Sequence, residues 1–428
     1  MTELDLAVTG YANGGLGIAR HNGRVVFVAG ALPGERVRAT LTQERTSFAR
    51  ASVVDVVDAS PHRIDPLCPA AAAGAGCCDL SFATPDHARE LGTRALSDVL
   101  ARIGGFGDRH RPLPPHVEAL DEDPTGWRVR TRLAVDPDGT IGLRSRGSAE
   151  IIAVPCAGPV DGLLDGVGGI GAAPGAELVV AAGADGRRHI VELAPVPAGG
   201  RRGGGRPGGR SGPDRRRRAQ RSRAVRSAPR AERVIEGEAQ VDQAVGERRW
   251  RIPVTGFWQA HRSAPGVYSR AAVDLLADAG VTGDVHVWDL YGGAGVFSGA
   301  LCDADAPFTV TSVDLVDTDA GALVAAQVAL ADAPVTAHRG GVAETVAGLA
   351  RPDLVISDPP RSGAGVDVVD AIVGARPRAV VHVGCDAAAF ARDLGRFASQ
   401  GYRVRAWRAF DAFPMTHHVE AMAVLSPG

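Results

Sequence analysis

Hydrophobic and polar positions alternate in short runs over the first 58 residues. From Leu4 to Val57 the chain divides into the strand-length pieces LDLAVTG, LGIARHNG, RVVFVAG, ERVRATLTQE and FARASVVDVVD. The segments between them contain Asn13-Gly14-Gly15, Asn22-Gly23 and Pro33-Gly34, residue types that favour tight turns. Five such strands predict a small OB-like barrel, a fold that often binds oligonucleotides. A barrel with a purely structural role is the alternative, and the pattern alone slightly favours it.

The pattern changes twice further along the chain. A helix is predicted over Pro85–Arg102, where Leu91, Leu96 and Val99 fall on one side. A second β-rich stretch follows, with strands on either side of the turn at Asp138-Gly139. From about Gly256 strand and helix patterns alternate. This alternation predicts a doubly wound, mostly parallel sheet that binds ligands at the carboxyl ends of its strands.

These patterns divide the chain into three predicted domains. Residues 1–58 form the barrel, residues 59–84 and 110–250 form a β-rich central domain, and residues 85–109 and 251–428 form the α/β domain. The central domain contains an Arg/Gly-rich insert at 196–233, whose low complexity predicts disorder.

Composition narrows the class of protein. The 428 residues are 45% hydrophobic and 22% charged, as in ordinary globular proteins. The N-terminus has no signal-peptide pattern, and no apolar run reaches the roughly 20 residues that a membrane span requires. We therefore expect a cytoplasmic protein without a membrane partner. In that compartment the six cysteines are more readily metal ligands, a nucleophile or buried thiols than disulfides.

Charge is distributed unevenly along the chain. The formal net charge is only −2, and every one of the 47 basic residues is arginine. Thirteen of these arginines lie in Arg201–Arg233, against two acidic residues. A concentrated basic segment is typical of polyanion binding, so a polyanion such as RNA is a predicted partner.

A glycine-rich loop suggests a cofactor site. In VWDLYGGAGVFSGAL (Val287–Leu301) a strand leads through Asp289, Gly293 and Gly295 into a helix, which lets the backbone approach a ligand closely. The next strand, TSVDL, carries Asp314 near its end, and an acid at this distance typically binds ribose hydroxyls. A chain without lysine has no P-loop lysine. The spacing therefore favours S-adenosylmethionine, with a structural turn as the alternative.

Three further residues combine into a candidate catalytic set. Asp358, in SDPPRSG, follows a predicted strand, and Cys385 stands between the next strand and a helix. A helix N-terminus lowers a thiol pKa, which favours the reactive thiolate. Glu420 is a charge within an otherwise apolar strand, which is unusual unless a site uses it. The alternatives are a plain Pro-Pro connector and a buried, inert cysteine.

These motifs resemble those of the bacterial RNA uracil-5-methyltransferases. DPPRSG, GCDAAAFARD, FPMTHHVE and GFWQAH carry the resemblance, and the first 58 residues look like the TRAM domain often attached to these enzymes. The resemblance implies an α/β protein that combines a class I (Rossmann-like) methyltransferase domain with an N-terminal OB-like β-barrel (TRAM) and a β-rich central domain. One departure is Asp386-Ala387, which replaces the family's Asn-Pro after the cysteine.

The resemblance also assigns roles to individual residues. Cys385 would be the nucleophile and Glu420 the general base. The residues that would bind the methyl donor S-adenosyl-L-methionine or shape its pocket are Gln259, Tyr291, Gly293, Asp314 and Asp358. Family members of the ribosomal RNA type hold a [4Fe–4S] cluster through four cysteines, for which Cys68, Cys77, Cys78 and Cys156 are available here. Unligated thiols are the alternative, because Cys77 and Cys78 are adjacent.

The implied reaction forms 5-methyluridine. A thiolate adds to uracil C6, C5 accepts the methyl group, and a base removes the C5 proton so that the thiolate leaves. The target uridine must be unstacked to be reached. We expect a monomer that acts on ribosomal RNA. The alternatives are a tRNA uridine methyltransferase, an RNA cytosine C5-methyltransferase, and a catalytically impaired RNA-binding protein with the same fold.

Overall fold

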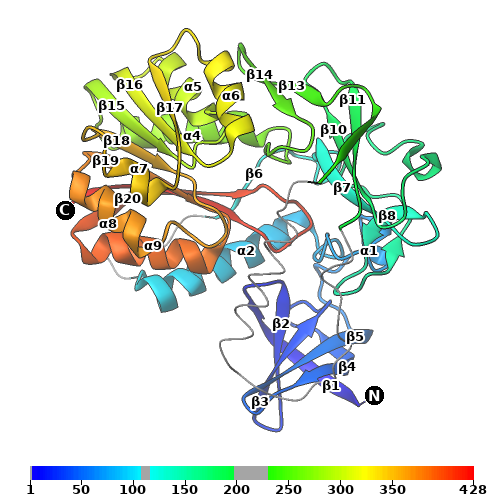
Figure 1. The fold of residues 1–428 in the computed structure, drawn as a ribbon. Helices are drawn as coiled ribbons and strands as arrows, with labels where there is room; N and C mark the ends of the chain where they lie inside the picture. Colours follow the sequence, from blue (N-terminus) through cyan, green and yellow to red (C-terminus); the bar gives the residue numbers. More distant parts are fainter. Residues whose placement is uncertain (1, 108–115, 197–229) are drawn as a thin grey trace.

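The computed structural model describes residues 2–107, 116–196 and 230–428, and Figure 1 shows their arrangement. The N-terminal strands form a closed barrel in the order β1-β2-β3-β5-β4. Their bounds are β1 Glu3–Ala12, β2 Leu16–His21, β3 Arg24–Ala29, β4 Arg36–Glu44 and β5 Phe48–Asp58. Alternate side chains such as Leu6, Val8, Val26 and Val28 fill the interior. The predicted five-stranded barrel is confirmed.

Short helices connect the barrel to the rest of the chain. They are α1 (Pro69–Ala72), α2 (Pro85–Val99) and a π-helical turn at Leu100–Gly104. The first half of α2 packs against the barrel side, where Leu91 joins Leu32 and Leu80 in one buried cluster. Its second half, with Leu96, joins the core of the C-terminal domain. Helix α2 therefore links the barrel to the domain that contains the candidate nucleophile.

The middle of the chain is β-rich. One six-stranded sheet has the order β12-β11-β10-β7-β8-β9, and a separate hairpin joins β13 to β14. The bounds are β7 Arg130–Val135, β8 Ile141–Arg144, β9 Ile151–Ile152, β10 Glu177–Ala182, β11 Arg188–Leu193, β12 Glu232–Glu236, β13 Gln240–Val245 and β14 Arg248–Pro253, with a 3-10 turn at Val167–Gly169.

The structure changes the bounds of the predicted insert. Strand β12 begins at Glu232, inside the predicted 196–233, and Arg233 pairs with Glu192 at 2.7 Å. The strand forms because Val234 and its neighbours pair in register with β11. Residues 197–229 of the insert lie outside the described residues, so the disorder predicted for the insert stays a prediction there.

An eight-stranded sheet forms the C-terminal domain, in the order β17-β16-β15-β18-β19-β21-β20-β6. The strands from β17 to β19 are parallel, and β21 is antiparallel to both of its neighbours. The bounds are β6 Glu118–Ala119, β15 Gly283–Leu290, β16 Phe308–Asp317, β17 Val335–Arg339, β18 Leu354–Ser357, β19 Ala379–Gly384, β20 Tyr402–Asp411 and β21 Glu420–Pro427. Strand β6, from the predicted central domain, thus extends this sheet.

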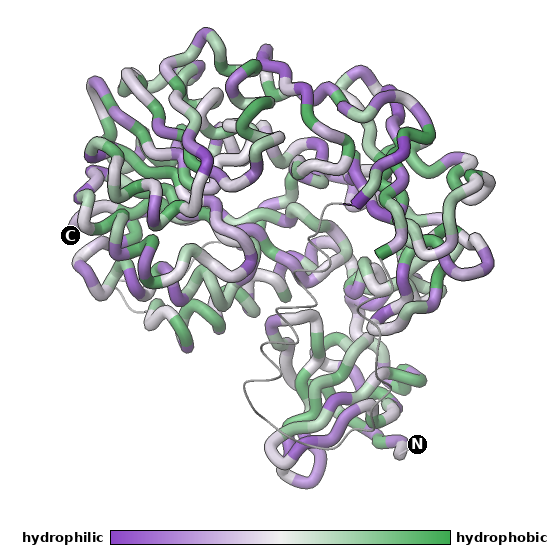
Figure 2. Tube along the Cα trace, viewed as in Figure 1, coloured by the Kyte–Doolittle hydropathy of each residue, from purple (hydrophilic) through white to green (hydrophobic). Residues whose placement is uncertain are grey.

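Helices cover both faces of this sheet, as the alternating pattern predicted. They are α4 Ala264–Asp278, α5 Val296–Asp303, α6 Ala320–Ala329, α7 Val342–Val346, α8 Gly365–Ala375 and α9 Ala387–Ser399. One core contains residues of α8 and α9 with the even-numbered residues of β15, and the other contains residues of α4 and α5 with the odd-numbered ones. Strands β18 and β19 are buried along their whole length, and hydrophobic colours follow them in Figure 2. Among the described residues, no helix is long and apolar enough to cross a membrane.

Candidate active site

The glycine loop lies between β15 and α5 and is shaped by a close backbone approach. Gly292 donates its N–H to the Val316 carbonyl at 3.2 Å, and a Cβ atom on Gly292 would lie 2.7 Å from Asp289 Cγ. Tyr291 has a φ of 60°, a strained value for a residue with a side chain. Gly293 faces open space, with no atom within 4 Å of where its Cβ would stand. The loop therefore leaves open space beside its backbone at Gly293.

Asp289 holds the loop against α5. Its carboxylate is fully buried and accepts hydrogen bonds from the Ser298 backbone N–H at 3.1 Å and from the Ser298 hydroxyl at 2.6 Å. Burial raises the pKa of Asp289 to about 6, against the opposing effect of those hydrogen bonds. Asp289 thus fixes the start of α5 under the loop.

The structure does not bring Asp314 to this loop. Strand β16 continues to Asp317, and Asp317 accepts the Gly293 N–H at 2.9 Å. Asp314 lies three residues earlier, so it points to the opposite face of the sheet, where His286 and His338 each contact its carboxylate at 2.7 Å. The structure thus places Asp317, and not Asp314, at the glycine loop. The sequence contained one sign of this, because Asp317 is a second acidic residue three positions after Asp314 in the same apolar run.

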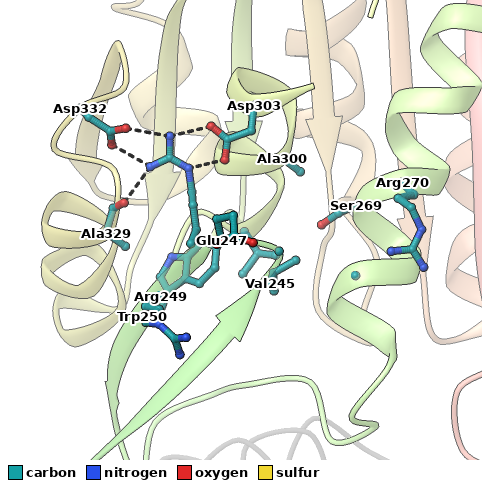
Figure 3. Close-up of a pocket in the computed structure, with 14 residues that line it drawn as sticks. Val245, Glu247, Arg249, Trp250, Ser269, Arg270, Ala300, Asp303, Ala329 and Asp332 are labelled. Carbon is teal, nitrogen blue, oxygen red and sulfur yellow. Dashed lines mark hydrogen bonds and ion pairs between the residues drawn. The ribbon is translucent and has the colours of Figure 1, made fainter. Parts of the chain in front are cut away.

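A cavity lies beside the loop, away from the candidate nucleophile. This Arg248 cavity measures about 630 Å³ and lies between the β13–β14 hairpin and helices α4, α5 and α6. Figure 3 shows its lining, with Asp303 and Asp332 on one side and Arg270 on the other. None of the predicted site residues lines it.

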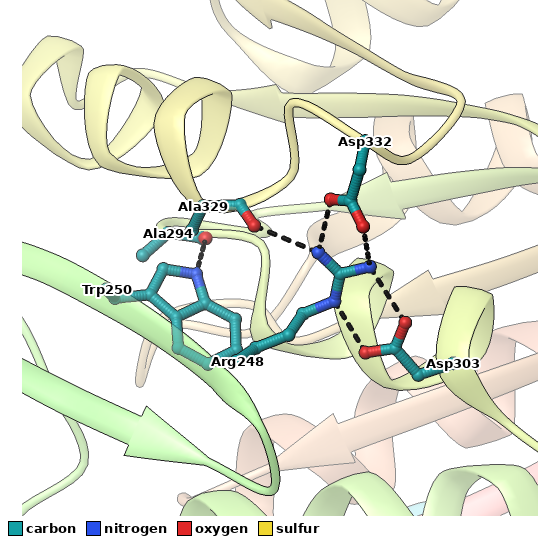
Figure 4. Close-up of polar contacts among 6 residues, drawn as sticks. All are labelled: Arg248, Trp250, Ala294, Asp303, Ala329 and Asp332. Atoms are coloured by element: carbon teal, nitrogen blue, oxygen red, sulfur yellow. Dashed lines mark hydrogen bonds and ion pairs between the residues drawn. The ribbon is translucent and has the colours of Figure 1, made fainter.

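The β13–β14 hairpin at this cavity supports the glycine loop. Trp250 donates its indole N–H to the Ala294 carbonyl within the glycine loop at 2.8 Å (Figure 4). Arg248 pairs at 2.7 Å both with Asp332 and with Asp303, and donates to the Ala329 carbonyl at 2.9 Å. These contacts tie the hairpin to the ends of α5 and α6, so the charged groups here hold structure together.

Cys385 lies one residue beyond the carboxyl end of β19. Its pocket, the Cys385 pocket, measures about 130 Å³ and is lined by residues of α2, of the 385–387 and 417–419 segments, and of the barrel. Burial first, then the charges of Glu420 and Asp358, raise the pKa of Cys385 to about 11, whereas Arg361 lowers it. The net direction of the pKa is therefore upward, opposite to the direction expected from the helix N-terminus. The Asp386 side chain caps α9 by accepting the Ala389 N–H at 2.9 Å.

Two buried carboxyl groups accompany the thiol. Glu420 is the first residue of β21 and is 5% exposed, and burial followed by the Asp358 charge raises its pKa well above the usual value. Burial, and then the Asp289 charge, raises the pKa of Asp358 to about 7. By the alternation of their strands, Cys385, Glu420 and Asp358 face the same side of the sheet as α4. The structure brings these three predicted residues to one sheet edge.

Tyr268, on α4, was missed by sequence reasoning. It is 2% exposed, and its hydroxyl has no hydrogen-bond partner in the described part of the chain. Burial and the charge of Glu420 raise its pKa well above the usual value. Tyr268 occupies an apolar helix face, so its sequence position indicates a core residue. Gln259, in the loop after β14, is partly exposed and makes no side-chain hydrogen bond within the described residues.

Four of the cysteines meet in the loop before α2 and at Cys156. Cys68 and Cys78 are buried in one cluster against which Cys77 and Cys156 pack, and the Cys68 and Cys156 sulfurs are 3.9 Å apart. Thiol–thiol hydrogen bonds, first those with Cys156, lower the pKa of Cys68 and Cys77. Across the described residues, no group of three or more His, Cys, Asp or Glu is arranged around a single metal ion.

Comparison with known proteins places this architecture in a family. Residues 2–54 match the TRAM domain. A protein of Corynebacterium efficiens named as an RNA methyltransferase is 41% identical, and the match covers 99% of this chain and 94% of that relative. The 23S rRNA (uracil(1939)-C(5))-methyltransferase RlmD of Alkalilimnicola ehrlichii is 33% identical, over 98% of this chain and 96% of that protein. The chain belongs to the RNA uracil-5-methyltransferase family.

A more distant relative of this uracil-5-methyltransferase family member has a solved structure with a similar fold. The tRNA (uracil-54, C5)-methyltransferase of Pyrococcus abyssi, in complex with S-adenosyl-L-homocysteine, matches with a TM-score of 0.68. The identity is 19%, and the match covers 99% of this chain and 100% of that chain. The likeness confirms the predicted fold class, a methyltransferase α/β domain behind an N-terminal barrel.

Proposed function

We propose that this methyltransferase forms 5-methyluridine in ribosomal RNA, with Cys385 as the nucleophile and Glu420 as the general base. The observation that carries this proposal is the edge of the main sheet. There Cys385 opens into a pocket and interacts electrostatically with the buried Glu420 and Asp358, while the glycine loop follows the parallel strand β15. A thiol and a carboxyl group at one sheet edge suit addition followed by proton abstraction.

The chemistry gives each group a task. The Cys385 thiolate forms a bond to uracil C6, and the ring electrons move to C5 and O4, which makes C5 nucleophilic. S-adenosylmethionine, when bound, supplies the methyl group that C5 receives. The Glu420 carboxylate then takes the C5 proton, and the carbon–sulfur bond breaks to restore the ring and the thiolate. Before these steps the Cys385 thiol and the Glu420 carboxyl group must each release a proton to solvent. The Arg361 charge, which lowers the pKa of both groups, favours this loss.

The residues around the glycine loop fit a methyl donor. The open side of Gly293 leaves room for a ligand against the backbone, and the Asp317 carboxylate ends β16 at that point. We assign ribose binding to Asp317 in place of Asp314. Tyr291, Gln259 and Asp358 keep their proposed contacts with the donor.

The substrate assignment rests on the closer functional relative. The 23S rRNA enzyme is 33% identical across nearly the whole chain, whereas the tRNA enzyme is 19% identical and supports the fold alone. Residues 1–58 would hold the RNA backbone, with the catalytic domain formed by 85–109 and 251–428. A cytoplasmic monomer completes the proposal, and size-exclusion chromatography with light scattering tests its oligomeric state.

One experiment tests the reaction. Total RNA from a strain that lacks the gene is incubated with the protein and labelled S-adenosylmethionine, then digested to nucleosides. Labelled 5-methyluridine is expected from the wild type and none from Cys385→Ala. Labelled 5-methylcytidine would support the cytosine enzyme. RNA binding without any labelled nucleoside would support the impaired RNA-binding protein.

We also propose that Cys68, Cys77, Cys78 and Cys156 hold a [4Fe–4S] cluster. Four thiols are the ligand set such a cluster needs, and the cubane is larger than a single ion, so its ligands need not converge on one point. The Arg128 charge interacts with three of these thiols, which suits an anionic cluster. Anaerobically purified protein should be brown and contain iron and sulfide; colourless, iron-free protein would overturn this assignment.

A further inference from the structure

The barrel contributes to the wall of the Cys385 pocket. Asn13 and Gly14, in the turn between β1 and β2, line the same cavity as Cys385. This cavity of about 130 Å³ has room for roughly four water molecules, so it fits one small ring rather than a nucleotide. A turn near the N-terminus is therefore part of the immediate surroundings of the nucleophile.

Contacts beside the pocket fix the position of this turn. Gly15 is buried with a φ of 77°, and a Cβ atom there would lie 2.5 Å from Asp79 Oδ2 and 3.1 Å from His417 Cβ. Asp79 in turn accepts the His417 backbone N–H at 3.0 Å and contacts the His417 ring at 2.6 Å. Only a glycine lets the turn approach so closely. The turn therefore packs against the Asp79–His417 pair at Gly15. His417 lies three residues before Glu420 in the chain.

The polar side chains of the pocket differ in their free hydrogen-bonding capacity. Asp386 caps α9, and the His417 ring is occupied by Asp79. The His418 ring packs against Phe413, and burial lowers its pKa to about 4, so it is neutral at pH 7. Asn13 is exposed, and its carboxamide has no hydrogen-bond partner within the described residues. The Asn13 carboxamide carries its donor and acceptor side by side, whereas the neutral His418 ring carries one donor and one acceptor on separate nitrogens.

We propose that the β1–β2 turn closes the base pocket and that the Asn13 carboxamide hydrogen-bonds the polar edge of the uracil held at Cys385. Uracil presents an N3–H donor between two carbonyl acceptors, and a carboxamide can pair with one donor and one adjacent acceptor at once. The barrel then contacts the reacting base as well as the RNA backbone. This inference rests on the proposed uridine methylation.

The test measures trapping of the base. An RNA that carries 5-fluorouridine at the position the wild type methylates forms a stable covalent adduct, because C5 has no proton to lose. The rate of adduct formation at saturating RNA, with S-adenosylmethionine present, is measured for the wild type and Asn13→Ala. Loss of a base contact should slow this rate about 10-fold. Asn13→Asp, which keeps the size but only accepts hydrogen bonds, should fall between the two.

The barrel supplies a matched control. Asn22 occupies the β2–β3 turn of the same barrel, is exposed, and has a φ of 50°, so Asn22→Gly removes a carboxamide without backbone strain. This variant should trap RNA within twofold of the wild type. The salt dependence of RNA binding should be unchanged in Asn13→Ala, because no phosphate contact is lost.

The outcomes separate this inference from the proposed function. An Asn13→Ala variant that traps RNA as fast as an active wild type refutes the base contact alone. So does a variant whose only change is weaker binding with a smaller salt slope, since that assigns Asn13 to the RNA backbone. A wild type that traps no RNA refutes the proposed function, and the Asn13 contact falls with it.

Discussion

The Arg248 cavity encloses about 630 Å³ and the Cys385 pocket about 130 Å³, yet their charged groups are arranged in opposite ways. In the larger cavity Arg248 is saturated by Asp303 and Asp332, both well exposed. The smaller pocket is lined by Cys385, whose pKa is raised by burial and then by the charge of Glu420. Glu420 itself is buried next to the lining residue Val419 in the chain, with no cationic partner in hydrogen-bond contact among the described residues. Charged groups that are paired with opposite charges stabilise the contact between elements. Buried ionisable groups without such a partner have shifted pKa values, which is typical of active sites.

The largest expected effect comes from the thiol. Cys385→Ala should lower uridine methylation at least about a thousandfold, because no other group can add to uracil C6. Incorporation of labelled methyl groups into RNA measures it. Cys302→Ala is the matched control, since Cys302 is also partly buried and burial raises its pKa to about 11 as well. Comparable losses of methylation activity in the two variants would show that Cys385 acts no differently from an ordinary buried thiol.

Removal of the proposed base should separate the two halves of the reaction. Glu420→Gln should slow turnover about a hundredfold or more, while the methylated RNA remains attached to Cys385. A shifted band on a denaturing gel, lost after nuclease digestion, reports this adduct. Normal turnover without an adduct would assign proton removal to another group.

The same substitution should change the pH dependence of stability. The folded pKa of Glu420 lies well above its ordinary value of 4.5, so the unfolded carboxyl loses its proton first as pH rises. Stability is therefore fully present below about pH 4.5 and falls by about 1.4 kcal/mol per pH unit until the folded group ionises. Glu420→Gln should remove that slope. Denaturant melts at pH 5 and pH 8 measure it, and an unchanged slope would mean that Glu420 is not buried in its protonated form.

Two carboxylates on β16 also differ in whether they are placed at the candidate site or hold structure elsewhere. Asp317 contacts the glycine loop, whereas Asp314 is held by two histidines on the other face of the sheet. Asp317→Asn should raise the KM for S-adenosylmethionine about 10-fold, as the loss of hydrogen bonds to a charged acceptor implies. Asp314→Asn should leave this KM within twofold. The reverse order would restore the original assignment of Asp314.

The smallest effect is expected in the larger cavity. Arg248→Met should reduce the free energy of unfolding by only about 1 kcal/mol, because both partner carboxylates can be solvated once the guanidinium is gone. Methylation at saturating substrates should stay within twofold. Urea denaturation and steady-state rates check both points, and a hundredfold loss of activity would show that this cavity takes part in the reaction.

Local sequence patterns predicted the parts of the site that local rules determine. Alternation and turn residues gave the barrel, and the strand–helix rhythm gave the parallel sheet whose carboxyl edge carries Asp358 and Cys385. The sequence named Asp314 and not Asp317, because the apolar run does not say where β16 ends. The raised pKa of Cys385 was missed because its causes, burial first and then the charge of Glu420 on another strand, exist only in the folded chain.

Strand order has a consequence for how the enzyme is made. Strand β21 is the last of the sheet along the chain, yet it lies between β19 and β20. During synthesis β20 therefore has no partner in the main sheet except the two-residue β6 until β21 emerges and inserts, and β19 keeps an open edge. Because β21 carries Glu420, the proposed base arrives at the moment the sheet closes. A nascent chain thus completes its sheet and its proposed catalytic pair in the same step.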